Sequence, residues 1–187
     1  MRGRGVPPPP PPKKRGGAPR RAKGGGVGER EGGVTDPQEK LAVLLGCPFL
    51  TLALHGEGAP YCVPLNFGAE EENGRLVLYF HCALEGTKLD LLRADGRVGF
   101  SAARMLRVFN KGIAPCGYTA DYESVCGFGT ARIVEEAAAR LHGLRVLMAH
   151  YTDESFPDES FLPRPLSLTA VVRVDVEAWT CKRLVRQ

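Results

Sequence analysis

Three short segments of the chain carry polar side chains of the kinds that bind small anionic or aromatic molecules. Each segment places an unusual polar residue at the edge of an apolar strand pattern, and the segments are residues 63–68, 79–90 and 122–129. The polar residues are Asn66, His81, Lys88 and Ser124. Together they supply a cation and both donors and acceptors of hydrogen bonds, so they predict a site for an anion and a heteroaromatic ring.

Lys88 follows Gly86 and Thr87 close to the expected start of a helix. Its ammonium group, the Thr87 hydroxyl and the free backbone N–H groups of a first helical turn together suit a phosphate. A lysine in a first helical turn is also commonly just solvated. This segment alone therefore leaves a phosphate site and a solvated lysine as two open interpretations.

His81 and Asn66 each have two interpretations as well. His81 ends an apolar strand, where it is either a structural residue or a group that positions a ligand or takes part in proton transfer. Asn66 lies between Leu65 and Phe67 and interrupts the apolar pattern unless its amide has a partner. That partner is either the polar edge of a bound ring or nearby backbone.

Ser124 lies in a strand pattern together with Gly127 and Gly129. A small hydroxyl and two glycines permit the close approach of a flat ligand or of a facing strand. The two glycines do not form a Rossmann fingerprint, because no third glycine follows at the required offset and no helix opens there. The four histidines have no metal-ligand spacing with each other or with the cysteines, which predicts no metal site.

Turn residues and apolar periodicity predict six strands and two or three helices. The strands are expected at residues 49–54, 61–67, 75–81, 97–102, 122–134 and 168–180. The helices are expected at about residues 36–45, with Asp36 as the cap and Gly46 as the stop, 86–93 and 135–151. Residues 103–120 and the proline-rich segment 157–165 are expected to be irregular. Because hairpins join most of the strands, we expect an antiparallel sheet closed into a small barrel, a mainly β (α+β) fold with flanking helices.

The first 34 residues differ in composition from the rest of the chain. They hold ten of the 23 glycines, an unbroken proline run over residues 7–12, and nine Lys or Arg against two Glu. Almost nothing apolar is available there for burial, so we predict a disordered basic tail over residues 1–34 and one domain over residues 35–187. The tail accounts for the positive net charge of the chain, and we expect no nucleic-acid partner for the domain.

The sequence predicts neither a membrane span nor a secretory signal. The longest apolar stretch, residues 41–54, is short and is broken by Pro48. No apolar segment follows the charges of the tail. The six cysteines form no C-x-x-C pair and predict reduced, partly buried thiols. We therefore expect a cytoplasmic protein.

The order and spacing of the three segments resemble the flavin-binding split β-barrels of the pyridoxamine 5'-phosphate oxidase-like superfamily. The predicted third helix ends in His150, Tyr151 and Thr152, and that end is similar to the family too. The similarity runs from about residue 35 to residue 183 and is greatest with the branch named after nitroimidazole-resistance proteins. It implies a six-stranded antiparallel split β-barrel that binds FMN.

The resemblance also implies roles for particular residues. Lys88, in its Glu-Gly-x-Lys-Leu-Asp setting, would bind the FMN phosphate, and His81 would lie beside the flavin as a positioning group or as a catalytic proton-transfer residue. The implied cofactor-binding residues are Pro64, Leu65, Asn66, Phe67, His81, Thr87, Lys88, Ser124 and Val125.

The resemblance further implies a homodimer in which the flavin lies between the two subunits. The implied activity is that of an FMN-dependent oxidoreductase that acts on a small organic substrate such as a nitro-aromatic, with NAD(P)H as electron donor. A barrel that binds haem or a deazaflavin, and a flavin-binding module without turnover, are the alternatives. Residues 97–104 are smaller and more basic than expected for the family, a departure that concerns the substrate side of the site.

Overall fold

The structure is a computed structural model, and it describes residues 32–56 and 58–186. Residues 1–31, most of the predicted tail, lie outside the described residues. The last two residues of the predicted tail, Gly33–Val34, form strand β1 and pair with Lys182 and Cys181. None of the helices in the described part of the chain is long and apolar enough to cross a membrane.

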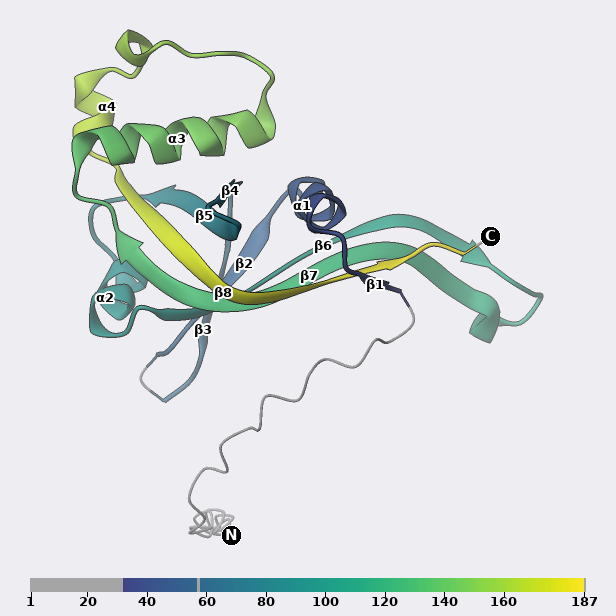
Figure 1. Cartoon of the computed structure of the whole chain (residues 1–187). Coiled ribbons are helices and arrows are strands. Elements are labelled where there is room, and N and C mark those ends of the chain that lie inside the picture. The colour runs from purple at the N-terminus through teal and green to yellow at the C-terminus, as the bar shows by residue number, and fades with distance from the viewer. Residues whose placement is uncertain (1–31, 57, 187) are drawn as a thin grey trace, which may run out of the picture.

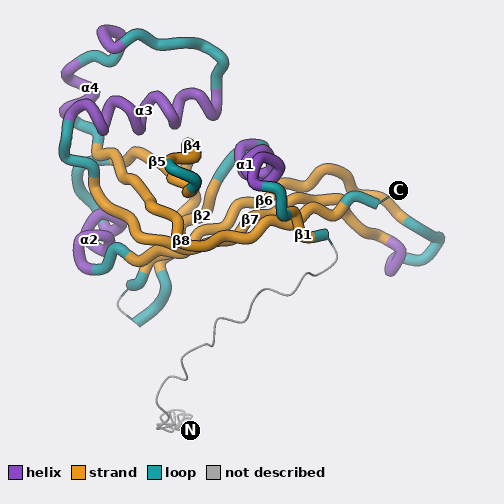
Figure 2. The backbone as a smooth tube through the Cα atoms, viewed as in Figure 1, coloured by secondary structure: helices purple, strands orange, loops and turns teal. Residues whose placement is uncertain are grey.

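Eight strands form one antiparallel sheet in the described residues (Figures 1 and 2). After β1 they are β2 Leu50–Leu54, β3 Tyr61–Leu65, β4 Gly68–Glu72, β5 Arg75–Cys82, β6 Arg97–Asn110, β7 Tyr118–Ile133 and β8 Ala170–Leu184. The prediction of six strands was wrong in number, because β1 and β4 were missed. β4 was missed because three consecutive glutamates follow Ala69, which gives it no apolar alternation.

The sheet curls until its two edge strands meet. The strand order is β3-β2-β6-β7-β8-β5-β4, with β1 beside β8. The strands at the two ends of this order, β3 and β4, are consecutive in the sequence and are separated only by Asn66 and Phe67. Two residues span less than about 10 Å, so the sheet must close on itself. This is the predicted split β-barrel.

Four α-helices and two short 3-10 helices complete the described fold. They are α1 Pro37–Leu45, α2 Thr87–Ala94, η1 Pro115–Gly117, α3 Ala137–Tyr151, η2 Asp158–Ser160 and α4 Pro163–Ser167. The predicted cap of α1 is confirmed, because the Asp36 carboxylate accepts a hydrogen bond from the Glu39 backbone N–H at 2.8 Å, and Gly46 ends the helix. The proline-rich segment was predicted to be irregular, which was wrong in part, since η2 and α4 form there.

The core fills the inside of the curled sheet. Alternate residues of the strands point inward, as in β2, where Leu50, Leu52 and Leu54 are buried and Thr51 is exposed. Two phenylalanines, Phe67 and Phe80, are among the largest fully buried side chains. Burial of this apolar surface is the main force that holds the barrel closed.

Helix α3 packs over β4 and β5 through two glycines (Figure 1). A Cβ atom added to Gly68 would lie 2.4 Å from the carbonyl oxygen of Val146 in α3. A Cβ atom added to Gly143 would lie 2.6 Å from the ring of Tyr79. The helix therefore approaches the sheet more closely than any larger residue at these two positions would allow.

Strands β6, β7 and β8 continue past the barrel as an arm, residues 103–123 and 182–186, seen on the right in Figure 1. The prediction that residues 103–120 are irregular was therefore wrong. Two bulges interrupt the strand pattern. In β6 the extra residue lies between Met105 and Arg107, and in β8 the extra residue is Glu177, opposite the step from Phe128 to Gly129 of β7. A bulge adds a residue to one strand and so reverses which residues face the core.

Two buried carboxylates hold the three strands of the arm together. Glu123 of β7 accepts hydrogen bonds from Arg104 of β6 at 2.6 Å and from Arg183 of β8 at 2.5 Å. Asp121 accepts in the same way from the Arg107 side chain at 3.0 Å and from the Arg186 backbone N–H at 2.9 Å. Both carboxylates are almost completely buried. Each is therefore shared between the two neighbouring strands.

The environment of Glu123 keeps it ionised. Burial raises its pKa, but the hydrogen bonds from Arg183 and Arg104 outweigh burial and lower the pKa below its ordinary value of 4.5. A carboxyl group whose pKa is lower in the folded protein stabilises the fold fully above its ordinary pKa. That stabilisation is lost as the pH falls through the lower pKa of the folded state.

We predict that Glu123→Gln lowers the free energy of unfolding by about 1–3 kcal/mol at neutral pH, because two charge-assisted hydrogen bonds are lost at a buried position. The difference from the unmodified protein should shrink when denaturation is repeated well below pH 4.5, where the carboxylate becomes protonated. Urea denaturation at both pH values measures it. Glu71→Gln, at an exposed position, is the control, and equal losses in both variants would contradict a special role of Glu123.

Candidate cofactor-binding site

The structure places the predicted site residues in two groups. One group, His81, Thr87 and Lys88, lies where β5 ends and α2 begins. The other group consists of Ser124, on β7 where that strand leads into the arm, and Asn66, which is exposed in the link between β3 and β4. In Figure 1, α2 and the arm lie at opposite ends of the sheet.

Helix α2 presents an uncapped start in the first group. Gly86 precedes the helix with a φ of +127°, a conformation that strongly favours glycine, and provides no side-chain cap. Its carbonyl accepts the first helical hydrogen bonds, from Leu89 and Asp90. The backbone N–H groups of Thr87 and Lys88 therefore point away from the helix, at the positive end of its dipole.

Lys88 is held beside the end of β5. Its Nζ atom lies 5.3 Å from the centre of the Phe80 ring, a cation–π contact. Phe80 is buried and the adjacent His81 is exposed, because neighbouring residues of a strand face opposite sides. A cation, two free N–H groups and the Thr87 hydroxyl thus lie together at the start of α2, which is a set of groups suited to a phosphate. The exposed His81 imidazole lies at the end of the adjoining strand β5.

The second group lies on a surface made of small side chains, which we call the outer face. One row of paired residues crosses five strands, and its members are Pro64, Thr51, Ser101, Cys126 and Thr180. The next row contains Ala103, Ser124 and Lys182. All eight residues are exposed or half-buried. Except for Lys182, these side chains are short, so a planar ring could approach the strands closely here.

The small residues in β6 account for the departure of residues 97–104 from the expected pattern. Gly99, Ser101 and Ala103 point to the outer face, whereas Val98 and Phe100 are buried. The basic character comes from Arg97, which pairs with Asp95, and from Arg104, which pairs with Glu123. These arginines therefore have structural partners, and the outer face of β6 is flat rather than charged.

Three of the residues implied by the resemblance have side chains that face the core. Leu65, Phe67 and Val125 are buried in the apolar cluster inside the barrel. Their contact with a cofactor would therefore be made by backbone atoms. Pro64 and Asn66, which alternate with them in the sequence, are exposed.

Sequence reasoning missed Lys182, which pairs with Ser124 across β7 and β8. Its Nζ atom lies 5.8 Å from the centre of the Tyr122 ring, so the side chain lies along the outer face. The last strand was predicted to end at residue 180, but β8 continues to Leu184. Continuing the alternation past the bulge would have placed Lys182 on the outer face.

The cavity found in the described part of the chain lies away from both groups of predicted site residues. A cavity of about 600 Å³ lies between the end of α3 and the segment that follows it, and it is lined by Arg145, Met148, Ala149 and residues 152–157. None of the predicted site residues lines it. In the described ranges, no cluster of three or more His, Cys, Asp or Glu has the geometry to hold a metal ion.

The sequence profile of a family described as pyridoxamine 5'-phosphate oxidase matches residues 36–183 of the chain. This range contains both groups and most of the arm. None of the curated proteins matches the sequence.

Several solved structures are similar to the chain. A candidate 5-nitroimidazole antibiotic resistance protein from Bacteroides thetaiotaomicron is 26% identical, with a TM-score of 0.68, and the similarity covers 81% of this chain and 86% of that one. An FAD- and haem-binding protein from Mycobacterium smegmatis is 20% identical, with a TM-score of 0.64 and coverage of 82% and 73%. A flavocytochrome from Azotobacter vinelandii is 16% identical, with a TM-score of 0.65 and coverage of 82% and 70%. The last two comparisons support the fold alone.

Proposed function

The chain belongs to the pyridoxamine 5'-phosphate oxidase family, and from that premise we propose that it binds FMN and works as a flavin-dependent oxidoreductase. The observation that carries the proposal is the combination of a cationic, uncapped helix start at Lys88 with a flat surface at Ser124. The first suits a phosphate and the second suits a planar ring, and FMN contains both.

The phosphate would bind at the start of α2. Lys88 supplies a positive charge, and the N–H groups of Thr87 and Lys88 supply hydrogen bonds directed along the helix dipole. The glycine at position 86 allows a ligand to approach the helix start, since a Cβ atom built there would have no atom within 4 Å. These features support the assignment of the phosphate to the start of α2.

The ring would lie on the outer face. Ser124 and Asn66 can donate and accept hydrogen bonds at its polar edge. Lys182, paired with Ser124, adds a positive charge that would stabilise negative charge on a reduced ring. The small side chains of Ala103 and Ser101 allow the ring to approach the strands closely.

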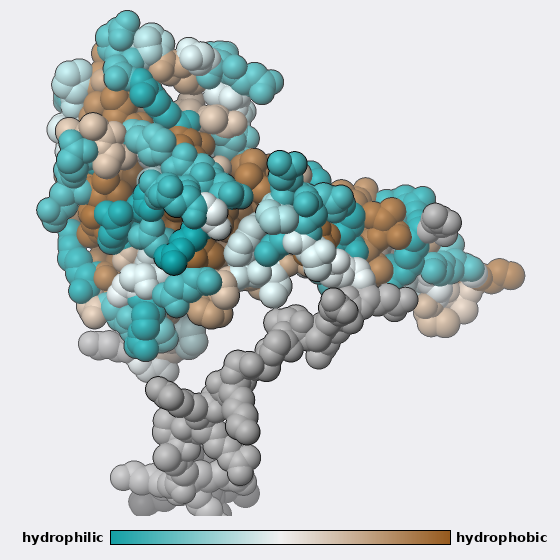
Figure 3. Space-filling view, viewed as in Figure 1, coloured by the Kyte–Doolittle hydropathy of each residue, from teal (hydrophilic) through white to brown (hydrophobic). Residues whose placement is uncertain are grey.

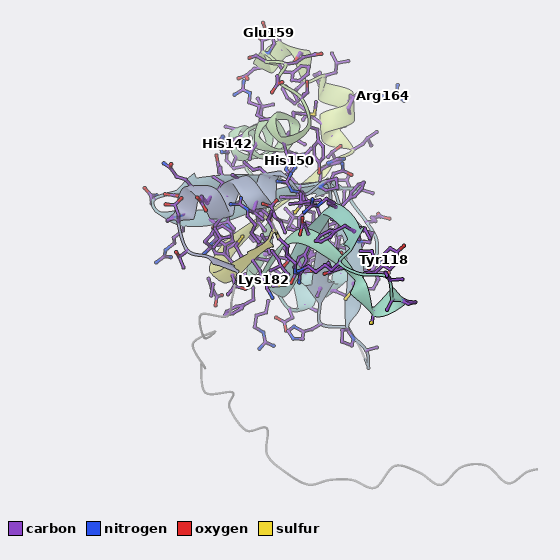
Figure 4. The ribbon with its side chains drawn as sticks, turned by 90° about the vertical axis from the view of Figure 1, so that its right-hand side faces the viewer. Tyr118, His142, His150, Glu159, Arg164 and Lys182 are labelled. Atoms are coloured by element: carbon purple, nitrogen blue, oxygen red, sulfur yellow. The ribbon has the colours of Figure 1, made fainter. Side chains whose placement is uncertain are left out.

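A second copy of the chain would complete the site. The two groups of site residues lie toward opposite ends of the sheet (Figure 1), and a homodimer would bring the α2 group of one subunit to the outer face of the other. The arm supports this arrangement because it exposes large apolar side chains, which are Met105, Leu106, Val108, Ile113 and Tyr118. Figure 3 shows apolar surface along the arm and at its tip, and Figure 4 labels Tyr118 there. Exposed apolar patches of this kind mark interaction surfaces.

The flavin would supply the two-electron chemistry, and the protein would supply position and charge. His81 is exposed beside the start of α2 and would hold or deliver a proton for the substrate. The similarity to a candidate nitroimidazole-resistance protein supports a small nitro-aromatic substrate, with NAD(P)H as donor.

The absorption spectrum of the purified protein tests the cofactor class, because haem gives a Soret band that a flavin lacks.

We predict that the protein binds FMN much more tightly than riboflavin, because the phosphate contributes the contacts at the start of α2. Lys88→Ala should weaken FMN binding by about 1–3 kcal/mol and leave riboflavin binding unchanged. Fluorescence titration measures both affinities. Arg93→Ala, in the last turn of the same helix, is the matched control. Equal affinities of the unmodified protein for FMN and riboflavin would exclude the phosphate assignment.

We predict that His81→Ala changes turnover and not folding. Because the side chain is exposed, its loss should alter stability by no more than about 1 kcal/mol. Stopped-flow measurement of flavin reduction and reoxidation should show a slower step in the variant, while the FMN affinity stays the same. His55→Ala, at another exposed histidine, is the control. Identical rates of flavin reduction and reoxidation in His81→Ala and the unmodified protein would indicate that His81 has only a structural role.

We predict that the protein is a dimer in solution and that Val108→Asp, on the exposed face of the arm, dissociates it. A buried carboxylate without a partner opposes association strongly. Light scattering should give half the mass for the variant, and FMN binding should weaken in parallel because each site would lose the residues of the second subunit. Glu71→Gln serves as a surface control away from the arm. A monomeric unmodified protein that binds FMN tightly would contradict the proposal of a shared site.

A further inference from the structure

The last turn of α3 is bonded to two loop segments that come together beside the outer face. The Tyr151 hydroxyl donates a hydrogen bond to the Pro48 carbonyl at 3.0 Å and accepts one from the Phe67 backbone N–H at 3.1 Å. The neighbouring His150 approaches the Cys47 carbonyl through Nε2 at 3.2 Å. Residues of one helix end therefore contact both the segment before β2 and the segment after β3.

These contacts occur where the ladder between β2 and β3 stops. The last ladder pair is Leu50 with Leu65. Two positions further along, the same antiparallel register would place Phe67 opposite Pro48. The Phe67 N–H would then donate directly to the Pro48 carbonyl. The Tyr151 hydroxyl bonds to both of these groups instead. It therefore replaces one interstrand hydrogen bond by two consecutive ones and holds the two segments further apart.

The side chain of Tyr151 is fixed in this place by its neighbours. Its ring stacks on the ring of His150 with 4.5 Å between centres, and the His150 ring meets the buried Phe67 ring edge-on at 4.4 Å. Figure 4 shows His150 below α3, next to the sheet. Because Phe67 is buried and its N–H is bonded to Tyr151, the backbone that carries the adjacent Asn66 has little freedom to turn.

The residue pair that lies between the last ladder pair and the Tyr151 bridge is Phe49 and Asn66. Both are exposed. In the register of the sheet, Phe49 continues the row of Ala103, Ser124 and Lys182. Asn66 therefore stands at the edge of the outer face, at the point where Tyr151 opens the ladder.

We propose that Tyr151 is a positioning residue for the cofactor site, which opens the β2–β3 ladder and fixes the Asn66 amide toward the edge of the bound ring. The inference rests on the proposed binding of a flavin. Tyr151 itself does not touch the ring: it acts through the backbone of Phe67 and so through Asn66. The hydroxyl group, rather than the aromatic ring, carries this role, because both hydrogen bonds are made by the hydroxyl.

Tyr151→Phe tests the proposal, because it removes both hydrogen bonds and keeps the ring that stacks on His150. In the protein without cofactor, hydrogen–deuterium exchange should show faster exchange of the Phe67 amide, while the melting temperature stays within a few degrees. With FMN, affinity should fall about fivefold to tenfold, the scale of a lost hydrogen bond, and the visible absorption bands of the bound flavin should shift. Tyr61→Phe, which removes the hydroxyl at the other end of β3, is the control and should change none of these.

A double-mutant cycle separates a positioning role from a general effect on stability. In the Asn66→Ala background, Tyr151→Phe should no longer weaken FMN binding, whereas in the Lys88→Ala background it should weaken binding by the full factor. The proposal would be overturned if the losses of FMN affinity in Tyr151→Phe and Asn66→Ala were fully additive. It would also be overturned if Tyr151→Phe left the FMN affinity and the flavin spectrum unchanged. Neither result would contradict flavin binding. Failure of the unmodified protein to bind any flavin would instead contradict the proposed function itself.

Discussion

The junction between the two edges of the sheet is the constraint on which the rest of the structure depends. β3 and β4 stand at opposite ends of the strand order but are consecutive in the sequence, so Phe67 must lie where the barrel closes. Next to this closure the ladder between β2 and β3 ends, and the Tyr151 hydroxyl satisfies the Phe67 N–H and the Pro48 carbonyl, which face each other there. Helix α3 is therefore both a cover for β4 and β5 and the element that completes the hydrogen bonding at the seam.

The same closure explains why the arm needs buried charges. Beyond the barrel, β6, β7 and β8 no longer face the other strands of the sheet, and α1 packs against β7 and β8 instead (Figure 1). Glu123 and Asp121 occupy the inward side of the arm, and arginines from the adjoining chain segments satisfy them. Arg104 also donates to the Gly46 carbonyl at 3.0 Å, which ties the arm to the end of α1. Ion pairs thus replace a hydrophobic core where the fold cannot supply one, and large apolar side chains remain exposed on the arm.

Much of the fold could be predicted from the sequence because local signals were strong. The Asp36 cap, the Gly46 stop, the alternation in β2 and the continuous apolar run in β5 can all be seen within a few residues. The arm could not be predicted in this way. Its inward residues are charged, and the two bulges reverse the alternation, so that Val174 and Val176 are buried before the bulge and Cys181 after it. β4 is also set by tertiary context, since its glutamates become part of a strand only because β5 and α3 lie beside it.

The site was predictable in its residue types but not in its arrangement. Lys88 was expected near a helix start and Ser124 in a strand, yet nothing in the sequence indicates that the start of α2 and the base of the arm lie toward opposite ends of the sheet. Lys182 was missed because its place opposite Ser124 depends on the bulge in β8. A row of paired residues that crosses several strands is a property of register. Register is set by pairing between segments far apart in the sequence. The flat outer face on which the proposed function depends therefore exists only once β2, β6, β7 and β8 have paired, and its small side chains have no special meaning in any one strand read alone.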